Sequence, residues 1–510
     1  MIIGAIGSWR RARVCGGGSI VLGEGTSGEI ELSWWVGADD RWHVPERAIT
    51  ARQHLVRDLP IVQTSVRVPG GDAIATAFVT VQGPRELVVL DVENRSKLPF
   101  ALALALRGRG VRNVTLDGSV VRIDGVPSLF LPRRPQKMAV TADCDTHDIR
   151  DVVMSGGAVD TFNAVEGPSS AAFVLPVTHA TTSRCAALLG VSSGAALLGA
   201  PVLSSLPSVH TLANGWSAQL GRGVTVKVPD ASFTAKLSSH AAALLLAAEP
   251  AVRDPATSTL LRAVLADALD GAGFTQEAGA LLEDMPDRQG PKGAFPGSDS
   301  LLASAAVVTA LGTHAMLTRN IVFASAMSPT VAGAIEFVAR RVRGDALLLP
   351  WLAAVRSAVD VFQVAGEGGA AKQAMRMWEK HGSPWPLPPL PVAPLPAVGA
   401  GGSLVPDDPQ RVALAVRGLV DALVTVDADG AADLLCGFDE SWRGQPIEVR
   451  NVATSAGRLS YAIRWHGARP ALLWEVEPVA DADAEPLRLR ATSIDPGWSG
   501  TGHRGDALLR

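Results

Sequence analysis

Tyrosine is almost absent from this chain. One of its 510 residues is a tyrosine, Tyr461, against 12 tryptophans and 12 phenylalanines. Cysteine is also scarce, and the few that occur lie far apart with no CxxC pair: Cys15, Cys144, Cys185 and Cys436. Such spacing argues against a disulfide framework or a zinc motif and predicts a reduced, cytoplasmic protein.

The chain also lacks a large excess of charge of either sign. The formal net charge is −4, so the basic stripe of a nucleic-acid-binding protein is missing and we expect no nucleic-acid partner. We find no apolar run of the roughly 18–20 residues that a membrane span needs, so no membrane contact is expected. The apolar start at 1–7 is too short for the core of a signal peptide. A length of 510 residues predicts several domains, and a hydrophobic content of 47% indicates that they are folded.

The first two hundred residues are typical of β-structure. Short apolar or alternating runs such as 87–93, 101–106, 120–123 and 171–175 are separated by clusters of Gly, Pro and Asn. This spacing predicts a β-sandwich over 1–212. The sequon at 94–96 is interpreted as a turn.

Helical periodicity replaces the β pattern near residue 215. We expect Asp254-Pro255 and Ser328-Pro329 to begin two helices, with an almost entirely apolar, buried helix at about 300–317 between them. Helical hairpins are predicted over 213–383.

The last part of the chain reverts to β after a linker. Residues 384–406 are rich in Pro and Gly and predict a semi-rigid tether, and 407–426 predicts one returning helix opened by Asp408-Pro409. A C-terminal β domain follows over 427–510, in which Trp465 and Trp474 are expected to pair across a hairpin. The predicted fold class is therefore multi-domain α+β.

Cofactor and metal motifs are missing. The ten histidines show no metal-ligand spacing, and there is no Walker loop and no GxSxG elbow. We therefore expect no metal and no cofactor.

Two carboxylates in the helical region are candidates for catalysis. Asp299 immediately precedes the buried helix, and Glu277 lies in the preceding amphipathic stretch. An inverting glycosidase needs an acid and a base roughly 6.5–9.5 Å apart, a separation that a sequence cannot give. The structural alternatives are a helix N-cap for Asp299 and a solvated helix face for Glu277.

Tryptophans supply the candidates for ligand binding. Trp34, Trp35 and Trp42 form the densest aromatic and polar cluster, and Trp351 lies in the helical region. The alternative for the first three is packing against the sandwich.

Several short segments carry a resemblance to a known superfamily. They are 68–72, 92–96, 215–216, 228–230, 287–289, 310–314, 317–320, 464–467, 472–475 and 495–498. With the order β, helical, β, they make the chain resemble the six-hairpin glycosidase-like superfamily, and in particular a group of actinobacterial glycosidase-like proteins. The resemblance implies an N-terminal β-sandwich, a domain like an (α/α)6 toroid, a small C-terminal β-sandwich and a carbohydrate ligand.

The chain departs from this superfamily where activity would reside. Members that look active tend to carry a Glu-Trp-Asp type stretch where this chain has Ser300-Leu301-Leu302, with Asp299 one position away. The helical region has room for roughly seven or eight helices, fewer than a complete (α/α)6 toroid needs, and it lacks tyrosine.

Three functions remain open at this stage. The favoured one is a catalytically degraded glycosidase-like protein that binds carbohydrate or serves as an accessory subunit, with a hetero-partner or as a homodimer. The second is an active inverting glycoside hydrolase or phosphorylase on an α-glucoside. The third is a structural scaffold for protein interactions.

Overall fold

The computed structural model describes most of the chain. The described residues are 1–22, 30–108, 111, 113–141, 148–160, 170–189, 201–297, 299–341, 348–380, 408–426, 430–467, 469–479 and 486–510. The expected linker at 384–406 and Cys144 lie outside them. By contact density the chain divides into two compact units, formed chiefly by Met1–Trp216 and by Ser217–Val398 with Val405–Arg510.

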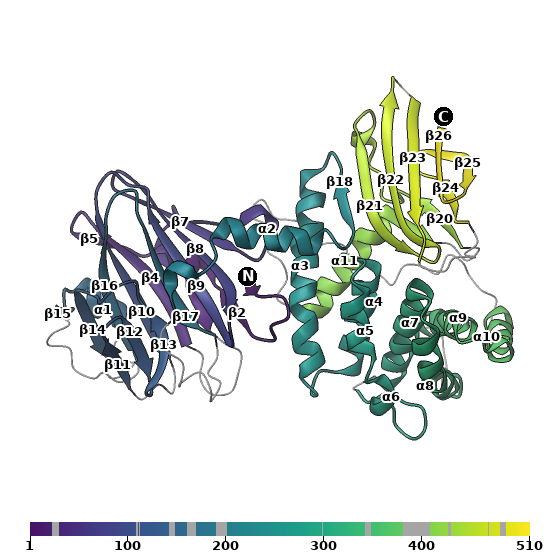
Figure 1. The fold of residues 1–510 in the computed structure, drawn as a ribbon, viewed down its shortest axis with the longest axis horizontal. Coiled ribbons are helices and arrows are strands. Elements are labelled where there is room, and N and C mark those ends of the chain that lie inside the picture. The colour runs from purple at the N-terminus through teal and green to yellow at the C-terminus, as the bar shows by residue number, and fades with distance from the viewer. Residues whose placement is uncertain are drawn as a thin grey trace. The chain divides into compact units, whose positions relative to one another are not determined.

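The N-terminal unit contains two antiparallel sheets (Figure 1). The first has the order β1-β2-β3-β4-β10-β16-β14-β15, with β5 also paired to β4. Its strands are β1 (Ile2–Gly4), β2 (Arg11–Val14), β3 (Ile20–Leu22), β4 (Ile30–Ala38), β5 (Arg41–His43), β10 (Phe100–Gly108), β14 (Lys137–Thr141), β15 (Val159–Asp160) and β16 (Ser170–Val177).

The second sheet has the order β11-β12-β13-β17-β9-β8-β7-β6. Its strands are β6 (Arg52–Leu55), β7 (Val62–Val68), β8 (Gly71–Gln82), β9 (Arg85–Asn94), β11 (Val114–Asp117), β12 (Val120–Ile123), β13 (Val126–Phe130) and β17 (Thr182–Leu188). One continuous core of buried side chains from both sheets fills the space between them. This is the predicted sandwich.

The outer face of the first sheet is partly covered by helix α1 (Ile149–Met154). Ile149 and Val153 of this helix join a second, smaller apolar cluster with Trp35 and the alanines of β10 and β16. The first sheet therefore buries its inner face and part of its outer face.

The sequon at 94–96 forms a buried turn, as predicted. The Asn94 side chain is fully buried and donates to the carbonyl oxygens of Leu98 (2.9 Å) and Val177 (3.1 Å), while its Oδ1 accepts from Ser96. Both amide hydrogens are thus used inside the fold.

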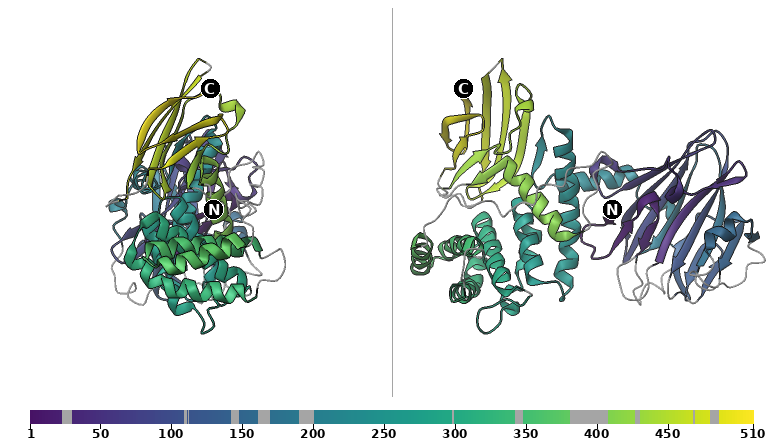
Figure 2. Two further views of the ribbon diagram at one scale, coloured as in Figure 1. Left: turned by 90° about the vertical axis from the view of Figure 1, so that its right-hand side faces the viewer. Right: turned by 180° about the vertical axis from the view of Figure 1, so that it is seen from behind.

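The second unit begins with a set of helices. They are α2 (Val209–Leu220, which crosses the boundary between the units), α3 (Ala231–Arg253), α4 (Thr259–Gly271), α5 (Thr275–Leu282), α6 (Met285–Arg288), α7 (Ser300–Thr318), α8 (Ile321–Ala339), α9 (Leu348–Val364), α10 (Gly368–Lys380) and α11 (Pro409–Leu423). Helices α11, α4, α7 and α9 contact one another in that order, and α3, α5, α8 and α10 flank them. The green helices of residues 300–380 pack side by side in both views of Figure 2.

Two predicted helix starts are wrong. The cap of α4 is Ser258, whose hydroxyl accepts from Leu261 N, while Asp254 ends α3 and its carboxylate accepts from Ala256 N. Pro329 lies inside α8, which begins after Asn320. A sequence does not distinguish a proline at the first position of a helix from a proline tolerated inside one, so a proline alone does not locate a helix start.

Within the described part of the chain, two helices are long and apolar enough to cross a membrane by length and composition, contrary to the sequence-based expectation. These are α7 and α8, and 61% and 50% of their respective most apolar windows are buried inside the fold. Such burial is also the pattern of core helices in a soluble protein.

The C-terminal part of this unit forms two sheets. One has the order β18-β21-β22-β23-β26 and the other β19-β20-β24-β25. The strands are β18 (Thr225–Lys227), β19 (Val424–Val426), β20 (Ala431–Leu434), β21 (Ile447–Thr454), β22 (Gly457–His466), β23 (Arg469–Glu477), β24 (Arg488–Ala491), β25 (Asp495–Thr501) and β26 (Arg504–Leu508). Strand β18 lies within the range that was predicted to be helical.

The predicted C-terminal hairpin forms, but its tryptophans do not pair. In the β22–β23 register Trp465 lies opposite Pro470, and Trp474 lies opposite Tyr461. Trp474 instead packs edge-to-face on Trp498 at a centroid distance of 5.8 Å. The turn at Gly467 sets the pairing register of β22 and β23, and the spacing of the tryptophans in the sequence does not predict that register.

Candidate functional site

A buried polar pair lies between α4 and α7. His314 Nδ1 lies 3.0 Å from both carboxylate oxygens of Asp270. Asp270 is fully buried and His314 is 5% exposed. Burial raises the pKa of Asp270 to about 6, against the effect of the hydrogen bond from His314.

Ion pairs continue from this pair to α11. Arg417 Nε lies 3.0 Å from Asp421 Oδ1, and Arg417 Nη1 lies 3.7 Å from Asp267 Oδ2. Thr313 Oγ1 donates to Asp267 Oδ1 at 2.9 Å. The carboxylates of Asp421 and Asp267 raise the pKa of Arg417, while burial raises the pKa of Asp421.

We call this set the helical charge cluster. It consists of Asp267, Asp270, Thr313, His314, Arg417 and Asp421. A carboxyl group with a raised pKa beside further charges is a frequent feature of functional sites, although structural ion-pair networks perturb pKa values too. The cluster ties α4, α7 and α11 together: the carboxylates of Asp267 and Asp421 pair with Arg417, and Asp270 is hydrogen-bonded to His314.

Sequence reasoning missed this cluster. Thr313 and His314 lie in the 310–314 segment that carries the superfamily resemblance, and Asp267 and Asp270 are spaced three residues apart on one helix. The only sequence signal is an acidic residue within an otherwise apolar helical stripe, which does not identify its partner on another helix.

Asp299 caps α7. Its Oδ1 accepts a hydrogen bond from Leu302 N at 3.0 Å, and the residue is exposed. The N-cap alternative therefore describes its local structure.

Glu277 lies in the first turn of α5 and is ion-paired. Its Oε1 accepts from Arg222 Nη2, and Arg222 also lies over the Phe274 ring at 5.9 Å. The second carboxylate oxygen of Glu277 is buried and has no hydrogen-bond partner within the described part of the chain. Glu277 is thus half-buried in a polar contact rather than on a solvated face.

Trp34 and Trp35 are fully buried in the N-terminal unit. Trp34 belongs to the core between the sheets, whereas Trp35 belongs to the smaller cluster under α1. Adjacent strand residues point to opposite faces, so the two rings cannot line one groove. Because their faces are covered by protein, neither presents a stacking surface in this structure.

The other two tryptophan candidates lie in different surroundings. Trp42 of β5 is half-buried and its ring lies over Gly37, where an added Cβ would come within 3.2 Å of it. Trp351 of α9 is 4% exposed and belongs to the helical region.

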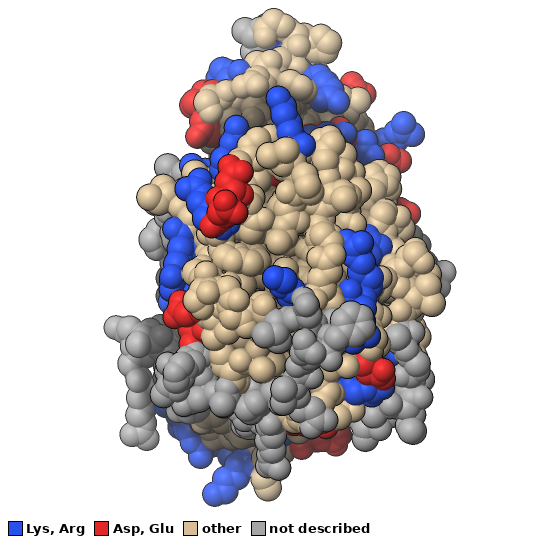
Figure 3. Space-filling model, turned by 90° about the vertical axis from the view of Figure 1, so that its left-hand side faces the viewer, with Lys and Arg blue, Asp and Glu red and all other residues tan. Residues whose placement is uncertain are grey.

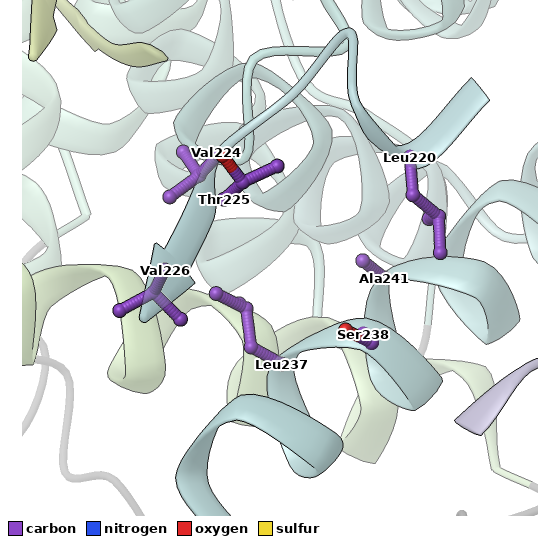
Figure 4. Close-up of a pocket in the computed structure, with 7 residues that line it drawn as sticks. All are labelled: Leu220, Val224, Thr225, Val226, Leu237, Ser238 and Ala241. Atoms are coloured by element: carbon purple, nitrogen blue, oxygen red, sulfur yellow. The ribbon is translucent and has the colours of Figure 1, made fainter. Parts of the chain in front are cut away.

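A small pocket lies between the end of α2, β18 and α3 (Figure 4). Its volume is about 80 Å³, and it is lined by Leu220, Val224, Thr225, Val226, Leu237, Ser238 and Ala241. An engineered cavity of about 150 Å³ holds benzene, so this pocket is too small for a sugar ring. Thr225 and Ser238 are the residues of its lining with polar side chains.

Among the described residues no group of three or more His, Cys, Asp or Glu side chains is placed to hold a metal ion. On the face that Figure 3 presents, basic and acidic side chains are interspersed rather than gathered by sign.

Comparison with known proteins gives structural similarity only. No family model matches the chain, and no curated protein does. A bacterial glucoamylase in complex with acarbose matches with a TM-score of 0.49 and 11% identity, over 74% of this chain and 65% of that one.

Two further solved structures are also glycoside hydrolases. A GH78 rhamnosidase of Bacillus sp. GL1 matches with a TM-score of 0.27 and 10% identity, over 59% of this chain and 32% of that one. A GH92 α-mannosidase from Bacteroides thetaiotaomicron matches with a TM-score of 0.26 and 9% identity, over 67% and 52%. The chain spans less than two thirds of the length of each of these three structures.

Proposed function

We propose that this chain is a cytoplasmic, glycosidase-like protein that binds carbohydrate as an accessory subunit without hydrolysing it. The proposal starts from the segments that resemble the six-hairpin superfamily, in particular its actinobacterial members, and from the order of sandwich, helical hairpins and C-terminal sheets. It includes association with a hetero-partner or a second copy.

The observation that carries the proposal is the hydrogen bonding of the two candidate carboxylates, Asp299 and Glu277. Asp299 is bonded to the backbone of its own helix, and Glu277 is bonded to Arg222. An inverting glycosidase needs one carboxyl group free to donate a proton and another free to activate water. One oxygen of each of these two carboxyl groups is occupied by a hydrogen bond within the chain, which supports a binding role over a catalytic one.

A second candidate function is an active inverting hydrolase or phosphorylase on an α-glucoside. One observation favours it: Asp299 is exposed at the start of α7, so a substrate can reach it. In that case Asp299 or Glu277 acts as the general acid, and another carboxylate of the helical region acts as the base.

Two assays on the full chain separate these functions. We expect calorimetry to detect binding of maltotriose or trehalose, and a reducing-sugar assay with maltooligosaccharides or trehalose to detect no turnover. Hydrolysis that disappears in the Asp299→Asn variant would establish the second function. Asparagine retains the capping oxygen, so this variant removes acid–base chemistry without removing the cap. Failure to bind any sugar, with a stable protein partner in a pull-down, would support the interaction scaffold instead.

A further inference from the structure

A row of polar side chains crosses the outer face of the first sheet. Glu31 of β4 lies opposite Arg107 of β10, Arg107 lies opposite Ser170 of β16, and Ser170 lies opposite Thr141 of β14. Directly opposed residues of neighbouring strands point to the same side of a sheet. We call Glu31, Arg107, Ser170 and Thr141 the polar row.

One end of the polar row adjoins a group of charged side chains that we call the charged rim: Glu31, Glu46, Arg107, Asp148 and Arg150. Arg107 Nη2 donates to Glu31 Oε1 (3.2 Å) and to Ser33 Oγ (3.1 Å), and Arg107 Nη1 lies 3.7 Å from Asp148 Oδ1. Asp148 is also paired with Arg150.

Glu46 completes this rim. Its carboxyl group interacts electrostatically with Arg107, Arg150 and Glu31, and burial raises its pKa. The Glu46 backbone lies so close to Gly17 that a Cβ there would come within 2.6 Å of it. The Glu46 backbone is therefore packed closely against Gly17.

Hydrogen-bonding capacity in this region is left unused. Ser170 is fully buried and Thr141 is 6% exposed, and neither hydroxyl has a partner within the described residues. The same holds for Arg107 Nε and for both carboxylate oxygens of Glu46. Buried polar groups in native proteins are almost always paired, so a concentration of unpaired ones in one place needs an explanation.

The unused groups define the chemistry of a ligand. Two hydroxyls can each donate and accept, one guanidinium N–H can donate, and one carboxylate can accept. Three carboxylates (Glu31, Glu46, Asp148) face two guanidinium groups (Arg107, Arg150), so the rim does not strongly favour an anion or a cation. Several hydroxyl groups on an uncharged molecule match this mixture.

We propose that the polar row and its charged rim bind a neutral, polyhydroxylated ligand. This inference rests on the proposed carbohydrate-binding function and assigns it a site. The rim side chains are partly exposed (Arg107 23%, Asp148 27% and Glu31 32%), whereas the two hydroxyls are enclosed. Entry therefore requires side chains of the rim to move.

The test uses two variants that keep the fold, Ser170→Ala and Thr141→Val. Removing an unpaired buried hydroxyl relieves an unsatisfied group, so both variants are expected to melt at or above the wild-type temperature in the absence of sugar. Each is expected to bind maltotriose or trehalose about tenfold more weakly, which is the effect of losing about one hydrogen bond. The matched control is Thr76→Val on the second sheet, where the hydroxyl accepts from Gln63.

Calorimetric titration of the full-length protein with each sugar distinguishes the outcomes. Weaker binding in the two variants together with unchanged binding in Thr76→Val supports the site. Wild-type affinity in both variants overturns the site but leaves the proposed carbohydrate function standing. No binding to the wild-type protein overturns both.

Discussion

His314 Nδ1 lies 3.0 Å from each carboxylate oxygen of Asp270, and both side chains are buried between α4 and α7. The His314 ring also packs edge-to-face with the ring of Phe323 of α8, at a centroid distance of 4.6 Å. An added Cβ at Gly279 of α5 would come within 3.3 Å of the same ring. One imidazole therefore contacts residues of three neighbouring helices.

Replacing His314 by Ala is expected to destabilise the helical region by about 3 kcal/mol, because it leaves the carboxylate of Asp270 buried without its partner. Urea denaturation followed by circular dichroism at pH 8 measures the loss. The control is His466→Ala at an exposed position of β22, which should change stability little. Equal stability of the two variants would show that the pair contributes nothing.

The stability of the fold is expected to depend on the ionisation of Asp270. Its pKa is about 6 in the folded protein against 3.8 for an ordinary aspartate, so the folded state binds a proton more tightly than the unfolded state. The tighter proton binding adds about 3 kcal/mol to the free energy of unfolding below pH 4, and this gain is lost as the pH rises through 6.

The Asp270→Asn variant isolates this effect, because asparagine cannot ionise. Unfolding curves at intervals between pH 4 and pH 7 should show wild-type stability falling relative to the variant across that range. A constant difference at all pH values would contradict the raised pKa of Asp270.

Asp299→Ala is expected to cost about 1 kcal/mol, since the Leu302 N–H loses its acceptor at the start of α7. Asp299→Asn should cost almost nothing, because the amide oxygen accepts the same bond. Thermal denaturation of the two variants side by side measures the difference. If both variants melted at the wild-type temperature, the cap would be dispensable.

Gly505→Ala is expected to destabilise the C-terminal sheets by about 1–3 kcal/mol. A Cβ at Gly505 would lie 2.3 Å from Cζ2 of Trp474, whose ring also packs against Trp498. Gly497→Ala is the control, since the nearest atom to its added Cβ is 3.7 Å away. The change in tryptophan fluorescence on urea unfolding reports both variants.

Local signals in the sequence predicted several elements correctly. Asp408-Pro409 begins α11, with Asp408 accepting from Gln410 N, and Asp299 begins the buried helix α7. These starts depend on residues within one turn of each other, so the sequence contains the whole interaction. The predicted helix start at Asp254-Pro255 is wrong because Ser258, four residues after Asp254, caps α4.

Burial and pairing over long distances were not predictable in this way. Trp34 and Trp35 belong to a cluster that is polar in sequence, yet both are fully buried, because β4 is covered on both faces. Nothing in the sequence indicates that a helix covers the outer face of that sheet.

The sequence by itself determined the multi-domain α+β order and the balanced charge, because short-range periodicity and composition set both. It also placed the single tyrosine in the C-terminal part, where Tyr461 Oη donates to the carbonyl of Leu423 at 2.9 Å. Only the tertiary structure decided which charges meet. Asp270 and His314 are 44 residues apart in sequence, and Arg107 and Ser170 belong to strands paired across the chain. Such contacts depend on strand register and helix packing, which bring distant residues into one environment and thereby set their burial and pKa.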